Sequence, residues 1–168
     1  GSFLNVVIFR TYEGESVVQG RSRCCVCKVP ILAKDLIPVL SYLRLKGRCR
    51  SCSSVISWQY PAVEIATGLL FLLAYWLGGG WIEVIRNWIF VGFVVIIFVY
   101  DLRYMLILDR FTIPAMMIAI VMNLLFGAVP MWSVLVGGVV LAGFFLIQFA
   151  ISKGTWVGGG DIRMGALM

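Results

Sequence analysis

Long apolar runs separated by short polar segments make up most of this chain of 168 residues. Each complete run is near the length of about 20 residues that a helix needs to cross the core of a bilayer. Residues 11–60 lack this pattern and form a long polar loop after a short apolar start at 1–10. The pattern predicts complete spans at about 61–77, 81–100, 111–127 and 131–151, and the start of another helix at 161.

The composition supports a membrane protein, because 61% of the residues are hydrophobic and only 13% are charged. The net charge of +6 comes mainly from the polar loop: nine of the fourteen Lys and Arg residues lie in 10–60, against three acids. An excess of basic residues beside membrane spans marks the cytoplasmic side. We therefore expect a cytoplasmic loop and a lipid bilayer as partner, and no nucleic acid. Alternating spans then place 101–110 and 153–163 on the same side.

Two cysteine pairs lie within this loop, Cys24-x-x-Cys27 and Cys49-x-x-Cys52. Paired thiolates at this spacing are a zinc signature, because each pair can occupy one edge of a tetrahedron around the metal. A site closed by four thiolates is structural rather than catalytic. Redox-active thiols or cysteines without a metal are the alternatives, and Cys25 lies outside the pattern.

Together these features predict an all-α polytopic membrane protein, a helical bundle with a zinc-binding cytoplasmic loop. Its expected parts are the end of a first transmembrane helix at 1–10, the basic zinc loop at 11–60 and a membrane bundle at 61–168. Because the sequence starts and stops inside apolar runs, we expect a fragment truncated at both ends.

Two aspartates carry the candidate chemistry. Asp161 follows Gly158-Gly159-Gly160, and Asp101 ends an earlier span on the same expected face. A charge at the bilayer centre costs about 2.5–3.5 kcal/mol on insertion scales, so such residues are usually functional. The chain has no histidine, which excludes a histidine general base within it. Two neighbouring carboxyl groups could activate water by sharing one proton. The glycines would allow an unwound or sharply turned backbone where an extended substrate could approach.

Simpler interpretations of these acids stay open. Asp161 could cap the helix that follows it, with the glycines making the turn. Asp101 and Asp109 could be interfacial charges paired with Arg103 and Arg110.

Several motifs occur in order along nearly the whole chain, and together they resemble the bacterial prepilin peptidase family, membrane aspartic proteases of the GxGD type. The motifs are Gly1-Ser2-Phe3-Leu4-Asn5-Val6-Val7-Ile8-x-Arg10, the two cysteine pairs, Leu36-Ile37-Pro38-Val39-Leu40-Ser41-Tyr42, Gly47-Arg48-Cys49-Arg50, Ile56-Ser57-x-x-Tyr60-Pro61-x-x-Glu64, Asp101-Leu102 and Gly158-Gly159-Gly160-Asp161. The family usually has Pro-Asp where Leu108-Asp109 stands here, and often a Lys where Arg163 stands. The doubled Cys24-Cys25 is also unusual.

The resemblance implies that Asp101 and Asp161 are the catalytic pair, with Gly158 and Gly160 supporting them. It further implies cleavage of leader peptides from type IV prepilins or pseudopilins, in pilus assembly, type II secretion or DNA uptake. The enzyme would lie in the bacterial inner membrane with its active site facing the cytoplasm. Many members also methylate the new N-terminus with S-adenosylmethionine, and these typically carry the cysteine-bearing loop.

Three other functions fit parts of the pattern. A GxGD protease of the presenilin or signal-peptide-peptidase type would cut inside a membrane helix, and Tyr100-Asp101 fits the first motif of that family. A cation transporter would use the two aspartates as ion ligands in broken helices. A membrane scaffold would use the zinc loop to recruit a partner, and both aspartates would be dispensable.

Overall fold

The computed structural model describes residues 1–127 and 129–167, and its regular elements are all helical. This confirms the expected all-α class. The chain divides into two compact units, Gly1–Ile96 and Ile97–Met168, and the division falls within helix α4 (Trp81–Tyr104). Each unit is described by itself below.

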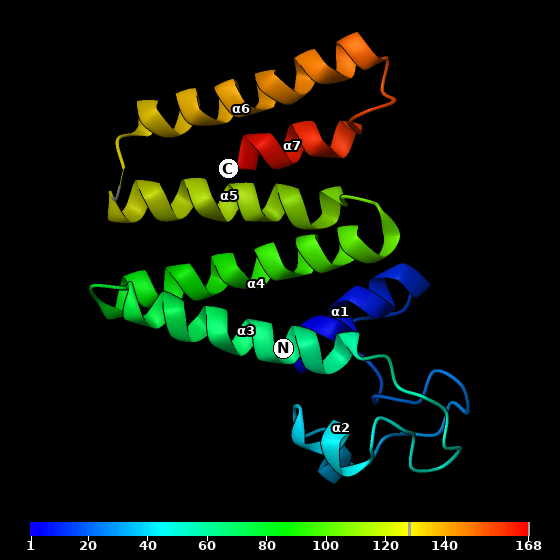
Figure 1. Ribbon diagram of the computed structural model, residues 1–168. Helices are drawn as coiled ribbons and strands as arrows, with labels where there is room; N and C mark the ends of the chain where they lie inside the picture. The colour runs from blue at the N-terminus through cyan, green and yellow to red at the C-terminus, as the bar shows by residue number, and fades with distance from the viewer. Residues whose placement is uncertain (128, 168) are drawn as a thin grey trace. The chain divides into compact units, whose positions relative to one another are not determined.

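Unit 1 is built on the pairing of α1 with α3 (Figure 1). Val7 and Ile8 of α1 and Val63 and Thr67 of α3 are buried. Gly14 ends α1 in the left-handed conformation that glycine adopts without strain. The elements of this unit are α1 (Ser2–Glu13), the 3-10 turn η1 (Ala33–Asp35), α2 (Leu40–Arg44), α3 (Gln59–Trp76) and the first part of α4.

The two helices of this pair run in opposite directions. The side-chain amide of Asn5 donates a hydrogen bond to the carbonyl of Tyr60 (3.2 Å), and the hydroxyl of Ser2 donates one to the carboxylate of Glu64. Later residues of α1 therefore extend beyond the first turn of α3, toward the polar loop.

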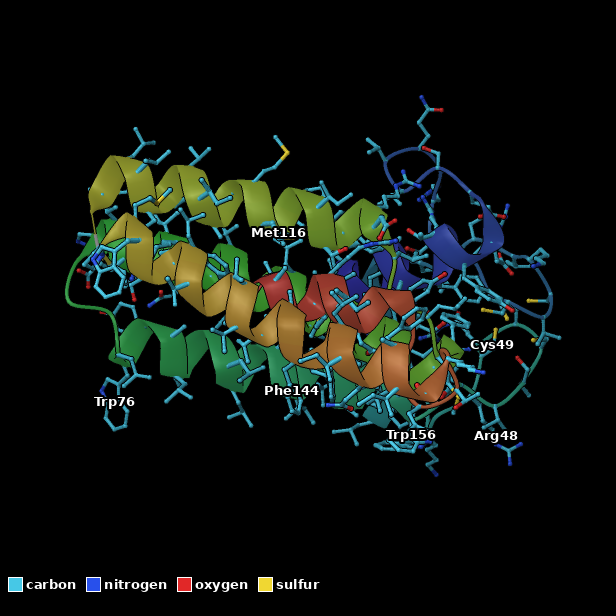
Figure 2. The ribbon with its side chains drawn as sticks, turned by 90° about the horizontal axis from the view of Figure 1, so that it is seen from above. Arg48, Cys49, Trp76, Met116, Phe144 and Trp156 are labelled. Atoms are coloured by element: carbon cyan, nitrogen blue, oxygen red, sulfur yellow. The ribbon has the colours of Figure 1, made fainter. Side chains whose placement is uncertain are left out.

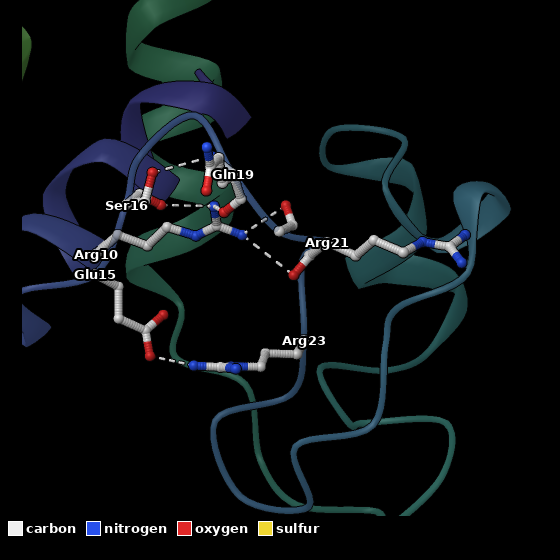
Figure 3. A network of polar contacts seen from close by, with 7 residues as sticks. Arg10, Glu15, Ser16, Gln19, Arg21 and Arg23 are labelled. Atoms are coloured by element: carbon white, nitrogen blue, oxygen red, sulfur yellow. Dashed lines mark hydrogen bonds and ion pairs between the residues drawn. The ribbon is translucent and has the colours of Figure 1, made fainter.

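Arg10 fixes the start of that loop (Figure 3). Its guanidinium group is buried and donates hydrogen bonds to backbone carbonyls within 16–21, including those of Gln19 (2.6 Å), Gly20 (3.0 Å) and Arg21 (3.1 Å). The buried guanidinium group needs such partners, because it carries five N–H donors in a rigid plane. One side chain therefore holds the turn that leads into the first cysteine pair. An ion pair between Arg23 and Glu15 closes the same turn.

In unit 2, α7 (Gly159–Leu167) packs against both α5 (Asp109–Phe126) and α6 (Met131–Ser152), and Figure 1 shows it between them. The contact with α6 is close because it is made by glycines. A Cβ atom on Gly165 would lie 2.9 Å from the carbonyl oxygen of Leu141 and 2.6 Å from the ring of Phe145. A Cβ on Gly138 would lie 3.1 Å from the carbonyl oxygen of Ala166. Small residues at such contacts let helix backbones approach, as is common in membrane bundles.

Three helices, α4, α5 and α6, are long and apolar enough to cross a membrane. Helix α3 covers the stretch expected to be the first complete span but is not among the three. Its first turns hold Gln59, Tyr60 and Glu64, which lower its mean hydropathy. Apolar side chains nevertheless project from all of these helices, as Figure 2 shows for Trp76 at the end of α3.

Helix boundaries differ from the expected ones at functionally relevant places. Helix α4 continues to Tyr104, so Asp101 is helical. Helix α5 begins at Asp109 and carries Pro114 inside it. Pro114 lies in the second turn, where it has no N–H to donate to the carbonyl of Arg110, yet the helix continues to Phe126.

The close contact between α6 and α7 yields a prediction. Gly165→Ala should lower the free energy of unfolding by about 1–3 kcal/mol, the usual cost of overpacking, because the new methyl group meets the backbone of Leu141. Gly143→Ala in α6 is the matched control, since a Cβ there meets nothing within 4 Å and alanine favours the helix. Thermal unfolding in detergent measures both. Equal stability of the two variants would contradict the close approach.

Candidate functional site

The two cysteine pairs fold as matching turns in the loop of unit 1. The carbonyl of Cys24 accepts a hydrogen bond from the N–H of Lys28 (3.0 Å), and the carbonyl of Cys49 accepts one from Ser53 (2.9 Å). Lys28 and Ser53, which directly follow the two pairs, have nearly the same positive φ, 58° and 57°. Two segments distant in sequence thus present their cysteines in the same way.

These turns bring four sulfur atoms together. The Sγ atoms of Cys24, Cys27, Cys49 and Cys52 all lie within 4.8 Å of one another, and those of Cys24 and Cys52 are 3.8 Å apart. A tetrahedral zinc with bonds of about 2.3 Å places its sulfur ligands roughly 3.8 Å apart. The cluster could therefore hold a metal ion, and its donor set fits structural zinc. Cys25 is outside the cluster, with its sulfur 4.0 Å from the Tyr60 hydroxyl.

The thiols of the cluster differ in how readily they ionise. A hydrogen bond from the backbone N–H of Cys27 lowers the pKa of Cys24 to about 6. For Cys27, a bond from the N–H of Val29 lowers the pKa, but desolvation and the neighbouring thiols outweigh it and raise it to about 11. Four thiolates this close repel one another, so a cation is required for all of them to ionise together.

Sequence reasoning missed Ser54, which belongs to the surroundings of this cluster. Its hydroxyl lies 3.1 Å from the sulfur of Cys52 and 3.7 Å from that of Cys24. The hydrogen bond lowers the pKa of the Cys52 thiol. Hydroxyl donors of this kind orient metal-bound ligands and favour their charged form.

Asp161 lies in the first turn of α7. Its Oδ2 accepts a hydrogen bond from the N–H of Gly158 (2.7 Å), just before the helix begins. Gly159 and Gly160 belong to the helix, and the non-helical backbone lies before them, up to Gly158. The capping contact accounts for this, because it gives the helix an anionic first turn, which the helix dipole stabilises.

Gly160 brings this turn against the connection between α4 and α5. A Cβ atom on Gly160 would lie 2.8 Å from the Cβ of Ile107, so only glycine allows this approach. Asp101 lies upstream of Ile107, exposed in the last turn of α4, where its carbonyl accepts the N–H of Met105 (2.7 Å). The structure thus brings the turn of Asp161 beside the connection that follows Asp101. In the described part of the chain, no hydrogen bond joins the two carboxyl groups.

Asp109 forms an ion pair with Arg163, rather than with the adjacent Arg110. The pair joins the start of α5 to the first half of α7. Both side chains are about half exposed, so the pair contributes about 1 kcal/mol or less. The pair is too weak to fix the position of α7, and it engages Asp109 in a contact distinct from the candidate dyad.

The metal site yields a prediction with an internal control. Cys49→Ser should lose most of its bound zinc and lower the unfolding temperature, because a four-thiolate site then keeps three ligands. Cys25→Ser should change neither, since its sulfur lies outside the cluster. Elemental analysis of purified protein and thermal unfolding measure the two effects. Full zinc content in Cys49→Ser would contradict the assignment.

Two family models match this chain, each over one part of it. Residues 1–77 match the bacterial peptidase A24 N-terminal domain, and residues 88–168 match the type IV leader peptidase family. No solved structure matches the chain.

Several relatives carry the name prepilin leader peptidase/N-methyltransferase. That of Neisseria gonorrhoeae is 32% identical, over 98% of this chain and 67% of its own length. Those of Klebsiella pneumoniae and Bacillus subtilis (strain 168) are 37% and 33% identical, over 86% and 100% of this chain and 65% and 67% of their own lengths. The chain thus spans about two thirds of these relatives. The motifs, the helical fold and these matches together show that the chain belongs to the type IV leader peptidase family of enzymes.

Proposed function

We propose that the protein is a membrane aspartic endopeptidase that removes the leader peptide from type IV prepilins or pseudopilins. The observation that carries this proposal is the placement of Asp161, on a first helical turn that Gly160 allows to lie against the connection following Asp101. Both aspartates fall within the stretch that matches the type IV leader peptidase family.

In the proposed mechanism, the two carboxyl groups share one proton. The ionised carboxylate accepts a proton from water, whose oxygen attacks the scissile carbonyl carbon, while the protonated carboxyl group donates its proton to the carbonyl oxygen. When the tetrahedral intermediate collapses, the C–N bond breaks and the leaving amine takes a proton from the dyad. No metal is needed for these steps, so the cysteine cluster is assigned to the stability of the loop.

The proposed setting follows from the charges along the chain. The basic loop at 11–60 lies in the cytoplasm, the membrane bundle occupies 61–168, and the protein is inserted in the bacterial inner membrane. The active site faces the cytoplasm and cuts before the apolar helix of the substrate. Pilus assembly, type II secretion and DNA uptake are the systems that use such substrates.

A second activity, methylation of the new N-terminus, is favoured by the names of the relatives and by the match of 1–77 to the N-terminal domain. The amine formed by cleavage would attack the methyl group of S-adenosylmethionine and lose a proton, leaving S-adenosylhomocysteine. Replacing one hydrogen by one methyl group adds about 14 Da to the product. Mass spectrometry of the cleaved substrate, with and without the methyl donor, detects this increment.

The catalytic pair is tested by two isosteric variants. Asp101→Asn and Asp161→Asn should each lower the cleavage rate by at least about 10²- to 10⁴-fold, the usual contribution of an acid–base group. An amide oxygen at 161 can still accept the hydrogen bond from Gly158, so the turn is kept while the ionisable group is removed. Asp109→Asn is the control and should cleave nearly normally, since Asp109 contributes only an exposed ion pair.

The assay uses the full-length protein in liposomes with a prepilin, and mass spectrometry reads the cleaved junction. Full cleavage by either the Asp101→Asn or the Asp161→Asn variant would contradict the assignment of these aspartates as the catalytic pair. Cuts inside the apolar helix of the substrate would instead favour a presenilin-type protease. Cation uptake that depends on both aspartates, without any cleavage, would favour a transporter.

The position of Asp161 is tested separately through the glycines. Gly160→Ala should strongly reduce cleavage, because its methyl group meets Ile107 and displaces the first turn of α7. Gly159→Ala should cleave almost normally, since a Cβ atom there meets nothing within 4 Å. Cleavage rates of the two variants at equal zinc content decide the point. Equal rates would contradict a positioning role for Gly160.

A further inference from the structure

A short segment of the loop in unit 1 leaves its apolar side chains uncovered. It runs from Lys34 to Lys46 and includes the short helix α2 (Leu40–Arg44). The apolar side chains that are exposed are Leu36 (44%), Ile37 (44%), Leu40 (62%) and Leu43 (64%). Such a group in water is unfavourable, and exposed apolar patches usually mark an interaction surface.

Glu64 fixes this segment beside the N-terminal end of α3. Its Oε2 accepts a hydrogen bond from the backbone N–H of Val39, at 2.8 Å, directly before α2. Val39 has a φ of 60°, which β-branched residues avoid, so the surrounding contacts must hold it there. Because Glu64 also accepts the hydroxyl of Ser2, it joins the segment to both helices of the pair.

The surface of α3 indicates where the edge of the membrane lies. After Glu64 the exposed positions of this helix are apolar, among them Ile65, Leu69, Leu72 and Trp76. Before Glu64 come Gln59 and Tyr60, preceded by the exposed Trp58. Tryptophan favours the interface between lipid and water. The exposed surface of α3 therefore changes from polar to apolar near Glu64. Glu64 is also the residue that accepts the hydrogen bond from Val39.

The charge of the segment identifies the kind of lipid. Lys34, Arg44 and Lys46 are exposed and form no ion pair in the described part of the chain. The one acid of the segment, Asp35, is neutralised by Arg50 through two hydrogen bonds of 2.7 and 2.8 Å. Arg48, just beyond, also projects away from the ribbon (Figure 2). Clustered basic residues beside a spanning helix attract anionic lipids.

We propose that residues 34–46 form an interfacial element that binds the anionic phospholipid leaflet. Leu36, Ile37, Leu40 and Leu43 enter the boundary between headgroups and acyl chains, and the basic side chains contact the headgroups. This inference rests on the membrane setting of the proposed function, not on proteolysis. It would hold the zinc loop against the membrane surface, independent of any substrate.

Photocrosslinking in vesicles tests the proposal. The photoreactive residue p-benzoylphenylalanine replaces Leu40 in the full-length protein, in vesicles with phosphatidylglycerol or with phosphatidylcholine alone. A second variant carries it in place of Val18, which is 90% exposed in the turn held by Arg10, beyond the end of α1 that lies away from Glu64. Zinc content equal to that of the wild type shows that each variant is folded.

After illumination, intact mass should show an added phospholipid at position 40 and little at position 18. The yield at 40 should fall several-fold in neutral vesicles, and also when Lys34, Arg44 and Lys46 are all changed to Gln. No lipid adduct at 40, equal adducts at 40 and 18, equal yields in neutral vesicles, or crosslinks only to protein or added prepilin would each overturn the proposal. Because no substrate is required, loss of prepilin cleavage would leave this result unaffected.

Discussion

The arrangement of unit 2 depends on how closely the backbone of α7 approaches its neighbours. Gly165 removes the side chain that would meet the carbonyl of Leu141, and Gly160 removes the one that would meet Ile107. Both ends of a nine-residue helix are thereby fixed, one against α6 and the other against the connection that follows α4. A helix this short is marginal in isolation, so packing rather than propensity determines its position. Because Asp161 lies in the first turn of α7, this packing also determines where its carboxyl group lies.

In unit 1 the loop is too polar to build a hydrophobic core, so other contacts must hold it in place. The charge of the buried Arg10 is surrounded by backbone carbonyls, which order the turn at 16–21. Four cysteines then gather where a metal ion could hold them, and Glu64 joins the segment around Val39 to α3. Each contact ties a polar segment to a helix or to another turn. Together they take the place of hydrophobic burial in the loop.

Much of this could be predicted from the sequence, because apolar runs and cysteine spacing are local signals. The all-α class and the four clustered cysteines follow from them. The family follows from motifs that occur in order along the chain. Specific side-chain and backbone contacts could not be predicted, whether between near residues, as with the five carbonyls around Arg10, or between distant ones, as in the approach of Gly160 to Ile107. Helix α7 begins at Gly159, two residues before the predicted start at 161. Three consecutive glycines suggest irregular backbone, while the cap made by Asp161 draws two of them into the helix.

The proposed mechanism requires Asp101 and Asp161 to act together on one water molecule. The separation of their carboxyl groups, determined by cryo-electron microscopy of the full-length protein in a bilayer, tests this directly. We predict a separation within about 6 Å, the range over which two carboxyl groups strongly influence each other's ionisation, across a space that admits water. Carboxyl groups facing opposite sides of their helices, with packed side chains between them, would contradict it.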